Sequence, residues 1–252
     1  MDRREFLRSC VLTTGAVCLS AASACKADGQ DDPLEDFYQA AERVLKERFG
    51  EESGSQLVLD TRRAYQDLSV EVPYIGGEEN IFTEWLDYGV FYLALYRALT
   101  PMGQSVEKAG RIIYETYWAM ADYPRWLISL VGKFRYNDKY VDTLRAAALL
   151  SQERRYEADF VCTFVEGDGE AFDYGLDIHE CAICKFYQQQ GAAELAPYLC
   201  LSDEVVSVAF NRGLVRYKTL AEGDEVCDFR YKKGCATYVE PLRDGWPPQF
   251  AG

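Results

Sequence analysis

The segment from His179 to Cys184 gathers the side chains of this sequence that are best suited to chemistry. It holds the only histidine of the chain, the carboxylate of Glu180, and the thiols of Cys181 and Cys184 in a Cys-x-x-Cys spacing. It falls where an expected strand passes into an expected helix, and the free N–H groups at a helix N-terminus lower the pKa of a thiol. These side chains could act as nucleophile, base or acid, and inert buried thiols are the structural alternative.

A second group of polar side chains lies in the segment Cys227-Asp228-Phe229-Arg230-Tyr231. Strand alternation places Cys227, Phe229 and Tyr231 on one face and Asp228 with Arg230 on the other. If only one face of the sheet is covered, the charged pair is solvated and contributes little to the stability of the fold. If both faces are covered, a charged pair there is costly, and Asp228 and Arg230 are then expected to form the polar floor of an active site.

The first 24 residues have the pattern of a twin-arginine signal peptide. Arg3-Arg4-Glu5-Phe6-Leu7-Arg8 precedes a short apolar stretch that ends in Ala22-Ser23-Ala24, and small residues of this kind mark a cleavage site. The stretch is shorter than the roughly 20 apolar residues that span a bilayer. We therefore predict export by the twin-arginine machinery. The product is expected to be a periplasmic or cell-surface lipoprotein, anchored in the membrane at Cys25 and followed by a linker over residues 25–32.

Six of the nine cysteines lie beyond Cys25, at positions 162, 181, 184, 200, 227 and 235. An even number in an exported chain suits disulfides. Twin-arginine substrates generally fold before export, in a reducing cytosol, which argues partly against them. One Cys-x-x-Cys is a weak zinc signal, because zinc sites usually have a second pair. Cys200, with Asp203 one turn further on, could complete a site with Cys181 and Cys227, so thiols, disulfides and metal ligands all stay open.

The chain is acidic, with 41 Asp and Glu residues against 27 Lys and Arg and a net charge of −14. A surface of this sign repels phosphate backbones, so we expect no nucleic-acid partner. The length suits one sizeable domain or two small ones.

Two regions of different periodicity must position the reactive residues. Over residues 33–155, apolar residues recur at every third or fourth position, which predicts helices divided by turns. Over residues 156–235 we expect two hairpins, turning at 166–169 and 221–224, with helices between them. Residues 236–252 are expected to form a C-terminal tail. The predicted fold is α+β, an N-terminal helical layer packed on a C-terminal antiparallel sheet of ββααββ order.

From about residue 33 to residue 232 the chain resembles the L-2-amino-thiazoline-4-carboxylic acid hydrolase family. The motifs that carry the resemblance are Tyr74-Ile75-Gly76-Gly77-x-x-Asn80, Leu93-Ala94-Leu95-Tyr96-Arg97, Glu180-Cys181, Gly191-Ala192-Ala193-Glu194-Leu195-Ala196-Pro197-Tyr198-Leu199-Cys200-x-x-Asp203 and Thr219-Leu220-Ala221-x-Gly223-x-x-x-Cys227-Asp228-Phe229-Arg230. The last motif is the most specific of them. The family is named for an enzyme of bacterial cysteine synthesis that opens a thiazoline ring to N-carbamoyl-L-cysteine.

The resemblance implies a hydrolase that opens a cyclic amidine or thiazoline ring in a small-molecule substrate. This reaction needs a base, a partner for the amidinium, a proton donor and a cation for the substrate carboxylate. Arg230 could bind that carboxylate as a fork, and Asn80 is a second candidate for substrate binding. The candidate catalytic residues are His179, Glu180, Cys181, Cys200, Asp203, Cys227 and Asp228, and the sequence leaves open whether a carboxylate activates water or a thiolate attacks the ring.

Two functions of other classes stay open as alternatives. One is a non-catalytic periplasmic lipoprotein that binds a small ligand or a metal through its cysteine cluster. The other is a redox protein that uses Cys181 and Cys184. The resemblance implies no known cofactor, and a metal bound by cysteines is the one cofactor that the residues themselves suggest.

Overall fold

The computed structural model of the protein describes residues 34–242 and Trp246. The predicted signal peptide, linker and lipid site at Cys25 lie outside the described residues. The first region is helical, as its periodicity predicts. Its helices are α2 (Glu35–Phe49), α3 (Glu51–Ser69), α4 (Phe82–Leu99), α5 (Val106–Met120), α6 (Arg125–Arg135) and α7 (Asp138–Ser151), with short 3₁₀ turns at Gly77–Glu79 and Thr100–Met102.

Local sequence signals set several helix boundaries in this region. The side chains of Ser105 and Asn137 accept hydrogen bonds from the N–H groups of Lys108 and Tyr140, which caps α5 and α7 at their N-termini. Gly50 joins α2 to α3 with φ at 85°, a conformation that favours glycine. α4 is apolar on most of its circumference, so it is the central buried helix, packed against α3, α5 and α8.

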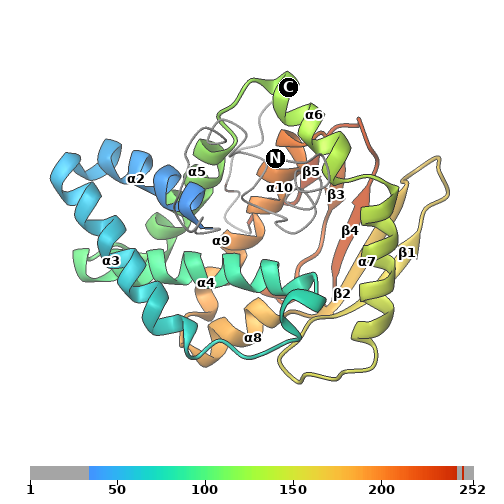
Figure 1. The fold of residues 1–252 in the computed structure, drawn as a ribbon, viewed down its shortest axis with the longest axis horizontal. Coiled ribbons are helices and arrows are strands. Elements are labelled where there is room, and N and C mark those ends of the chain that lie inside the picture. Colours follow the sequence, from blue (N-terminus) through green and yellow to red (C-terminus); the bar gives the residue numbers. More distant parts are fainter. Residues whose placement is uncertain (1–33, 243–245, 247–252) are drawn as a thin grey trace, which may run out of the picture.

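The second region forms a five-stranded sheet. Its strands are β1 (Val161–Glu166), β2 (Tyr174–Glu180), β3 (Leu214–Arg216), β4 (Cys227–Tyr231) and β5 (Tyr238–Val239), in the spatial order β1-β2-β4-β3-β5. The helices α8 (Ala182–Gln189), α9 (Ala196–Cys200) and α10 (Ser202–Ala209) separate β2 from β3. In Figure 1 the sheet lies on one side of the molecule, α2 and α3 lie on the other, and α8, α9 and α10 lie between them.

The α+β class is confirmed, but the predicted antiparallel ββααββ unit is not the whole arrangement. A third helix lies between the hairpins, and a fifth strand, within the predicted tail, pairs parallel with β3. Because β2 and β3 occupy both sides of β4, the chain that leaves β4 can join the sheet only at an outer edge, and it joins at the free edge of β3. It reverses direction on the way, so β5 runs antiparallel to β4 and parallel to β3.

The pleat of the sheet sorts its side chains onto two faces. One face is buried against the helices and the other is more open. The buried face carries Cys162, Leu176, Ile178, Cys227, Phe229 and Tyr231, and the open face carries Thr163, Asp177, His179, Asp228 and Arg230.

Side chains of α7 and its C-cap pair with the outward backbone groups of Cys162, near the start of β1. The Ser151 hydroxyl accepts a hydrogen bond from the Cys162 N–H at 2.9 Å and lies 3.2 Å from the Cys162 carbonyl. The Gln152 amide donates to that same carbonyl. At the opposite edge, β5 has only two residues and is followed at once by Glu240 and Pro241.

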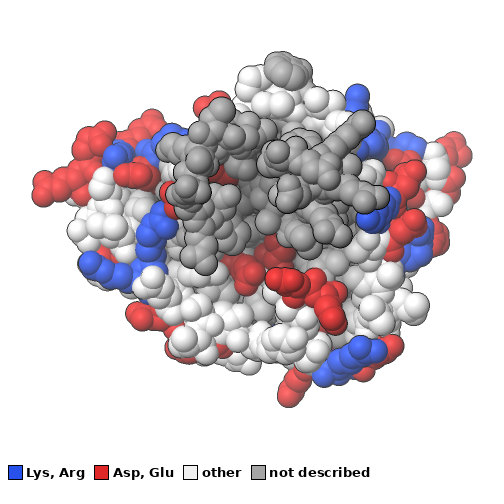
Figure 2. All heavy atoms as spheres, viewed as in Figure 1, with Lys and Arg blue, Asp and Glu red and all other residues white. Residues whose placement is uncertain are grey.

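Acidic side chains gather near the middle of the face drawn in Figure 2. On the face drawn in Figure 2, basic side chains lie mainly at the periphery, beside acidic ones. Within the described part of the chain, no helix is both long and apolar enough to cross a membrane.

Candidate active site

Three of the predicted cysteines meet at the buried face of the sheet. Cys181 lies at the junction of β2 with α8, Cys200 ends α9, and Cys227 begins β4. Burial raises the pKa values of Cys200 and Cys227, the latter to about 11, and the nearby thiol of Cys181 raises both further. The fold therefore brings together three thiols that lie 19 and 27 residues apart in the sequence.

The hydroxyl of Thr219 links two of these thiols. It donates to Cys200 Sγ at 3.6 Å and accepts from the Cys227 thiol at 3.7 Å. The N–H group of Leu220 also points at Cys227 Sγ, at 3.2 Å. The loop that connects β3 to β4 thus supplies polar contacts to both sulfurs.

Backbone geometry explains the motif that contains Thr219. Gly223 ends a 3₁₀ turn over Leu220–Glu222 with φ at 90°, so glycine is favoured there. The Asp224 carboxylate accepts from the Thr219 N–H at 2.8 Å, and the Asp228 carboxylate accepts from the N–H groups of Tyr217 and Lys218 at 2.9 and 2.7 Å. The acidic and glycine residues of the motif therefore hold the loop in shape.

An ion pair between a buried guanidinium and a partly exposed carboxylate adjoins the thiols. The Arg216 side chain is 2 % exposed, and its guanidinium donates to the Asp203 carboxylate and to the Cys200 carbonyl, the latter at 2.9 Å. Burial raises the pKa of Asp203 in spite of the opposing effect of Arg216. A charge pair in this position is costly to desolvate, which is typical of groups that serve a site.

Cys181 differs from its neighbours in its electrostatics. The Cys184 thiol is the main cause that lowers the pKa of Cys181, and the N–H groups of Cys184 and Ile183 at the start of α8 contribute. The pKa of Cys184 itself is raised, first by its hydrogen bond with Cys181 and then by burial. All six described cysteines are free thiols, so Cys181 is the member of the cluster best suited to exist as a thiolate.

The structure separates three predicted site residues from the thiols. His179 is exposed on the open face of the sheet, 3.0 Å from the Thr163 hydroxyl. Asp228 and Arg230 lie on that face too, but they do not pair: Asp228 accepts from the backbone, and Arg230 forms its ion pair with Asp177 at 2.7 Å. Asp228 and Arg230 therefore form no ion pair with each other, and Arg230 pairs instead with Asp177, which the register sets directly opposite Asp228.

Glu180 and Asn80 both have structural partners. Glu180 accepts from Lys185 at 2.6 Å and from Arg154, and these hydrogen bonds lower its pKa. Both N–H bonds of the Asn80 amide are used, one to the Ile75 carbonyl at 2.6 Å and one to Asp159 at 2.8 Å. These contacts explain the Gly-Gly-x-x-Asn motif as a turn joined to the start of β1.

Sequence reasoning missed Arg216, although the hairpin with its expected turn at 221–224 includes this residue. Leu214 and Arg216 share the buried face while Val215 does not, so a charged residue in an apolar alternation was the available signal. It also missed the link that Thr219 makes, although the residue was part of the motif.

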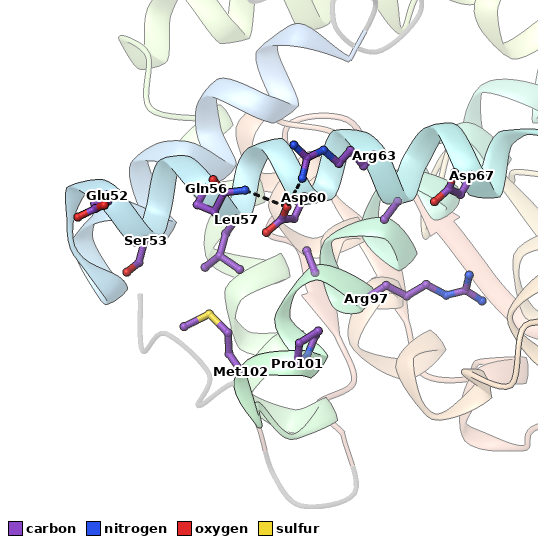
Figure 3. A pocket seen from close by; sticks show the side chains of 12 residues that line it. Glu52, Ser53, Gln56, Leu57, Asp60, Arg63, Asp67, Arg97, Pro101 and Met102 are labelled. Atoms are coloured by element: carbon purple, nitrogen blue, oxygen red, sulfur yellow. Dashed lines mark hydrogen bonds and ion pairs between the residues drawn. The ribbon is translucent and has the colours of Figure 1, made fainter.

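A separate groove of about 660 Å³ lies between α3 and the C-terminal end of α4 (Figure 3). Gln56, Asp60 and Arg63 on its wall satisfy one another through contacts at 3.0 and 3.1 Å. No cysteine lines this groove, so the chemistry suggested by the sequence lies elsewhere. Among residues 34–242, no group of three or more His, Cys, Asp or Glu side chains is arranged to hold a metal ion.

Thiols, a carboxylate and a guanidinium lie together between the sheet and its covering helices. This combination of groups in an α+β fold is typical of an enzyme that acts on a small molecule. Residues 86–231 match the family model for L-2-amino-thiazoline-4-carboxylic acid hydrolase, and the chain belongs to this family. The matched range contains all the thiols of the cluster together with Asp203, Arg216 and Thr219. No curated protein and no solved structure matches the chain.

Proposed function

We propose that this protein hydrolyses a small cyclic amidine, with L-2-amino-thiazoline-4-carboxylate as its substrate and N-carbamoyl-L-cysteine as the product. The observation that supports this most directly is the convergence of Cys181, Cys200, Cys227 and Asp203 on one buried face, within the range that matches the family. The cluster offers a nucleophile, proton donors and an anion for an amidinium, which are the groups that the reaction needs.

In the first step, the Cys181 thiolate adds to the ring carbon that lies between the ring nitrogen and the ring sulfur. The bond from this carbon to the ring sulfur then breaks, and the sulfur leaves as a thiol after taking a proton from Cys200 or Cys227. Burial raises the pKa of both thiols, so they keep their protons until a basic sulfur forms beside them. The substrate is then joined to Cys181 as an isothiourea.

In the second step, water adds to the isothiourea carbon and the bond to Cys181 breaks. The Cys181 thiolate leaves, and the carbon becomes the carbonyl of a ureido group. The Asp203 carboxylate, fixed by Arg216, can pair with the cationic nitrogens and accept the proton of the water. The proton that Asp203 accepts then passes to the Cys200 or Cys227 thiolate left by the first step. One water is consumed in the cycle, and the enzyme returns to its starting state.

Release of a new thiol gives a direct test, because the ring has none and the product has one. The purified protein is incubated with an excess of L-2-amino-thiazoline-4-carboxylate, and thiols above the protein background are measured over time. We expect Cys181→Ser to lower turnover by roughly a hundredfold or more. Cys235→Ser is the matched control, since Cys235 is exposed and outside the cluster. Absence of thiol release by the wild type contradicts the proposal.

We also propose that the protein acts outside the cytoplasm as a lipoprotein. The support is the twin-arginine pattern at Arg3-Arg4 and the Ala-Ser-Ala sequence before Cys25.

A further inference from the structure

We infer that the Thr219 hydroxyl relays a proton from the Cys227 thiol to Cys200, so that the two thiols act as one acid, a role that rests on the proposed function. Thr219 lies in the loop between β3 and β4, and its residue is only 8 % exposed. Its hydroxyl oxygen lies 3.6 Å from Cys200 Sγ and 3.7 Å from Cys227 Sγ. One buried hydroxyl therefore contacts both sulfurs.

The hydrogen bonds of this hydroxyl have a defined direction. A hydroxyl has one proton to donate and two lone pairs that accept. The Thr219 proton is donated to Cys200 Sγ, and the oxygen accepts from the Cys227 thiol and from the Ala221 N–H group, the latter at 3.2 Å. The capacity of the hydroxyl is thus fully used. Its bonds form a chain of protons that runs from Cys227 through Thr219 to Cys200.

Cys200 is the end of this chain that a substrate can reach. Cys200 is partly exposed, whereas Cys227 is buried, at 6 % exposure. Because Cys200 Sγ accepts the Thr219 proton, the proton of its own thiol is left for another acceptor. Cys200 is therefore the thiol that donates to the ring sulfur as it leaves, and Cys227 is the reserve behind it.

The transfer balances without any further reactant. When Cys200 gives its proton to the leaving sulfur, Cys200 becomes a thiolate. The Thr219 proton then moves to Cys200, and the Cys227 proton moves to the Thr219 oxygen, so that the negative charge moves to Cys227. In the second step of the reaction, the proton from Asp203 enters at Cys200, and the chain returns its other protons to their starting positions.

Cys227 is the better of the two places for that charge. After the transfer, Cys227 Sγ has two donors, the Leu220 N–H group at 3.2 Å and the Thr219 hydroxyl. Hydrogen bonds to a charged acceptor are the stronger kind. Burial raises the pKa of Cys227 to about 11, and the contacts with Leu220 and Thr219 oppose that rise. At Cys200 the main effect that opposes burial is the charge of Arg216.

Two substitutions of Thr219 separate the hydroxyl from the rest of the side chain. Thr219→Val removes the hydroxyl at nearly constant shape, and we expect it to lower kcat by about tenfold with little change in KM. Thr219→Ser keeps the hydroxyl and should keep most of the turnover. Thr163→Val is the matched control, because Thr163 lies on the open face of the sheet, away from the thiols. Its kcat should equal that of the wild type.

A double-mutant cycle distinguishes a relay from a packing effect. Cys227→Ala breaks the same chain at its next atom and should also lower kcat by about tenfold. The double variant should lose no more than either single variant, because both changes remove one transfer. Losses that multiply overturn the inference, as does an unchanged kcat in folded Thr219→Val. If Thr219→Val does not fold, an unchanged kcat in Cys227→Ala overturns it.

Alkylation of Cys227 tests the chain without substrate. Iodoacetamide reacts with the thiolate, and the rate at pH 9 is followed by mass spectrometry of the Cys227 peptide, with exposed Cys235 as the reference. We expect Thr219→Val to slow this reaction by about tenfold, since the thiolate loses a donor, and Thr219→Ser to leave it nearly unchanged. Equal rates in wild type and Thr219→Val overturn the relay. A wild type that shows this difference but releases no thiol from the thiazoline counts against the proposed hydrolysis alone.

Discussion

Arg230 forms its ion pair with Asp177, across the β2–β4 strand pair, with 2.7 Å between Nη1 and Oδ1. Both side chains are about a quarter exposed, so water screens the pair and its contribution is expected to be no more than about 1 kcal/mol. The pair lies on the face opposite to the thiols. The pair therefore joins two strands of the sheet and makes no contact with the candidate site.

Replacing Arg230 should accordingly have little effect on catalysis. We expect Arg230→Gln to change kcat/KM by less than about threefold and the free energy of unfolding by no more than about 1 kcal/mol. Asp203→Asn, in the ion pair with Arg216, should lower kcat by roughly a hundredfold. Thiol-release kinetics and urea denaturation measure the two effects, and a large loss of activity in Arg230→Gln would return Arg230 to the site.

Asp228 should act on the site by positioning its loop. Asp228→Ala removes the acceptor for two N–H groups that precede Thr219, and we expect it to cost about 1–3 kcal/mol of stability. Asp228→Asn keeps one acceptor oxygen and should recover at least half of that loss. Urea denaturation gives the stabilities. Equal stability of the Ala and Asn variants would show that the loop does not depend on this acceptor.

Alkylation of Cys181 should have a midpoint below the ordinary thiol pKa of about 8.5. Cys184→Ala should shift this midpoint upward, because the Cys184 thiol is the main cause of the lowered pKa. Cys184→Ser retains a donor and should shift it less. Iodoacetamide rates from pH 5 to 10, followed by mass spectrometry of the Cys181 peptide, measure the midpoints (exposed Cys235 serves as the internal reference). An unchanged midpoint in Cys184→Ala would contradict this assignment.

Glu180 should make the free energy of unfolding depend on pH in the acidic range. Lys185 and Arg154 lower its pKa in the folded protein, whereas in the unfolded chain it is about 4.3. The stabilisation is thus complete above that unfolded value and is lost as the pH falls through the lower folded value. We expect Glu180→Gln to be less stable than the wild type at pH 7 and the difference to shrink below about pH 4. Glu170→Gln, at an exposed carboxylate, should show no such change, and parallel curves for wild type and Glu180→Gln would rule the effect out.

The N-terminal segment gives a cellular prediction. Replacing Arg3 and Arg4 with Lys should leave precursor in the cytosol, and Cys25→Ser should release the exported protein from the membrane. Fractionation and immunoblotting measure both. If Cys25→Ser stays as membrane-bound as the wild type, the lipid anchor is wrong, although cleavage at that point could still occur.

Periodicity was a good guide to most elements and a poor guide to the sheet as a whole. The repeats of apolar residues predicted the helices α2, α4, α5 and α7 and both hairpins, because burial of one stripe or face determines them locally. The parallel pairing of Val215 with Tyr238 depends on which edge of the sheet is free, and a single strand of two residues has no periodicity to show.

The sequence predicted which thiols come together, but it did not predict the partners of the charged side chains. Cys181, Cys200 and Cys227 were expected together because they fall within family motifs at element junctions. The hydrogen-bond and ion-pair partners of Asp203, Asp228 and Glu180 lie on other elements of the fold. Which side chains meet there depends on strand register and tertiary packing, and the alternation of apolar and polar residues specifies neither.

The two edges of the sheet influence whether this protein associates with other chains at high concentration. An unpaired strand edge is a template on which another chain can add, and a row of free N–H and C=O groups is what such pairing requires. Here Ser151 and Gln152 occupy the outward backbone groups of Cys162, and the opposite edge offers two residues before a proline that has no N–H to donate. Few free backbone groups are therefore available for strand addition at Cys162 and at β5, which favours a protein that stays dispersed at high concentration.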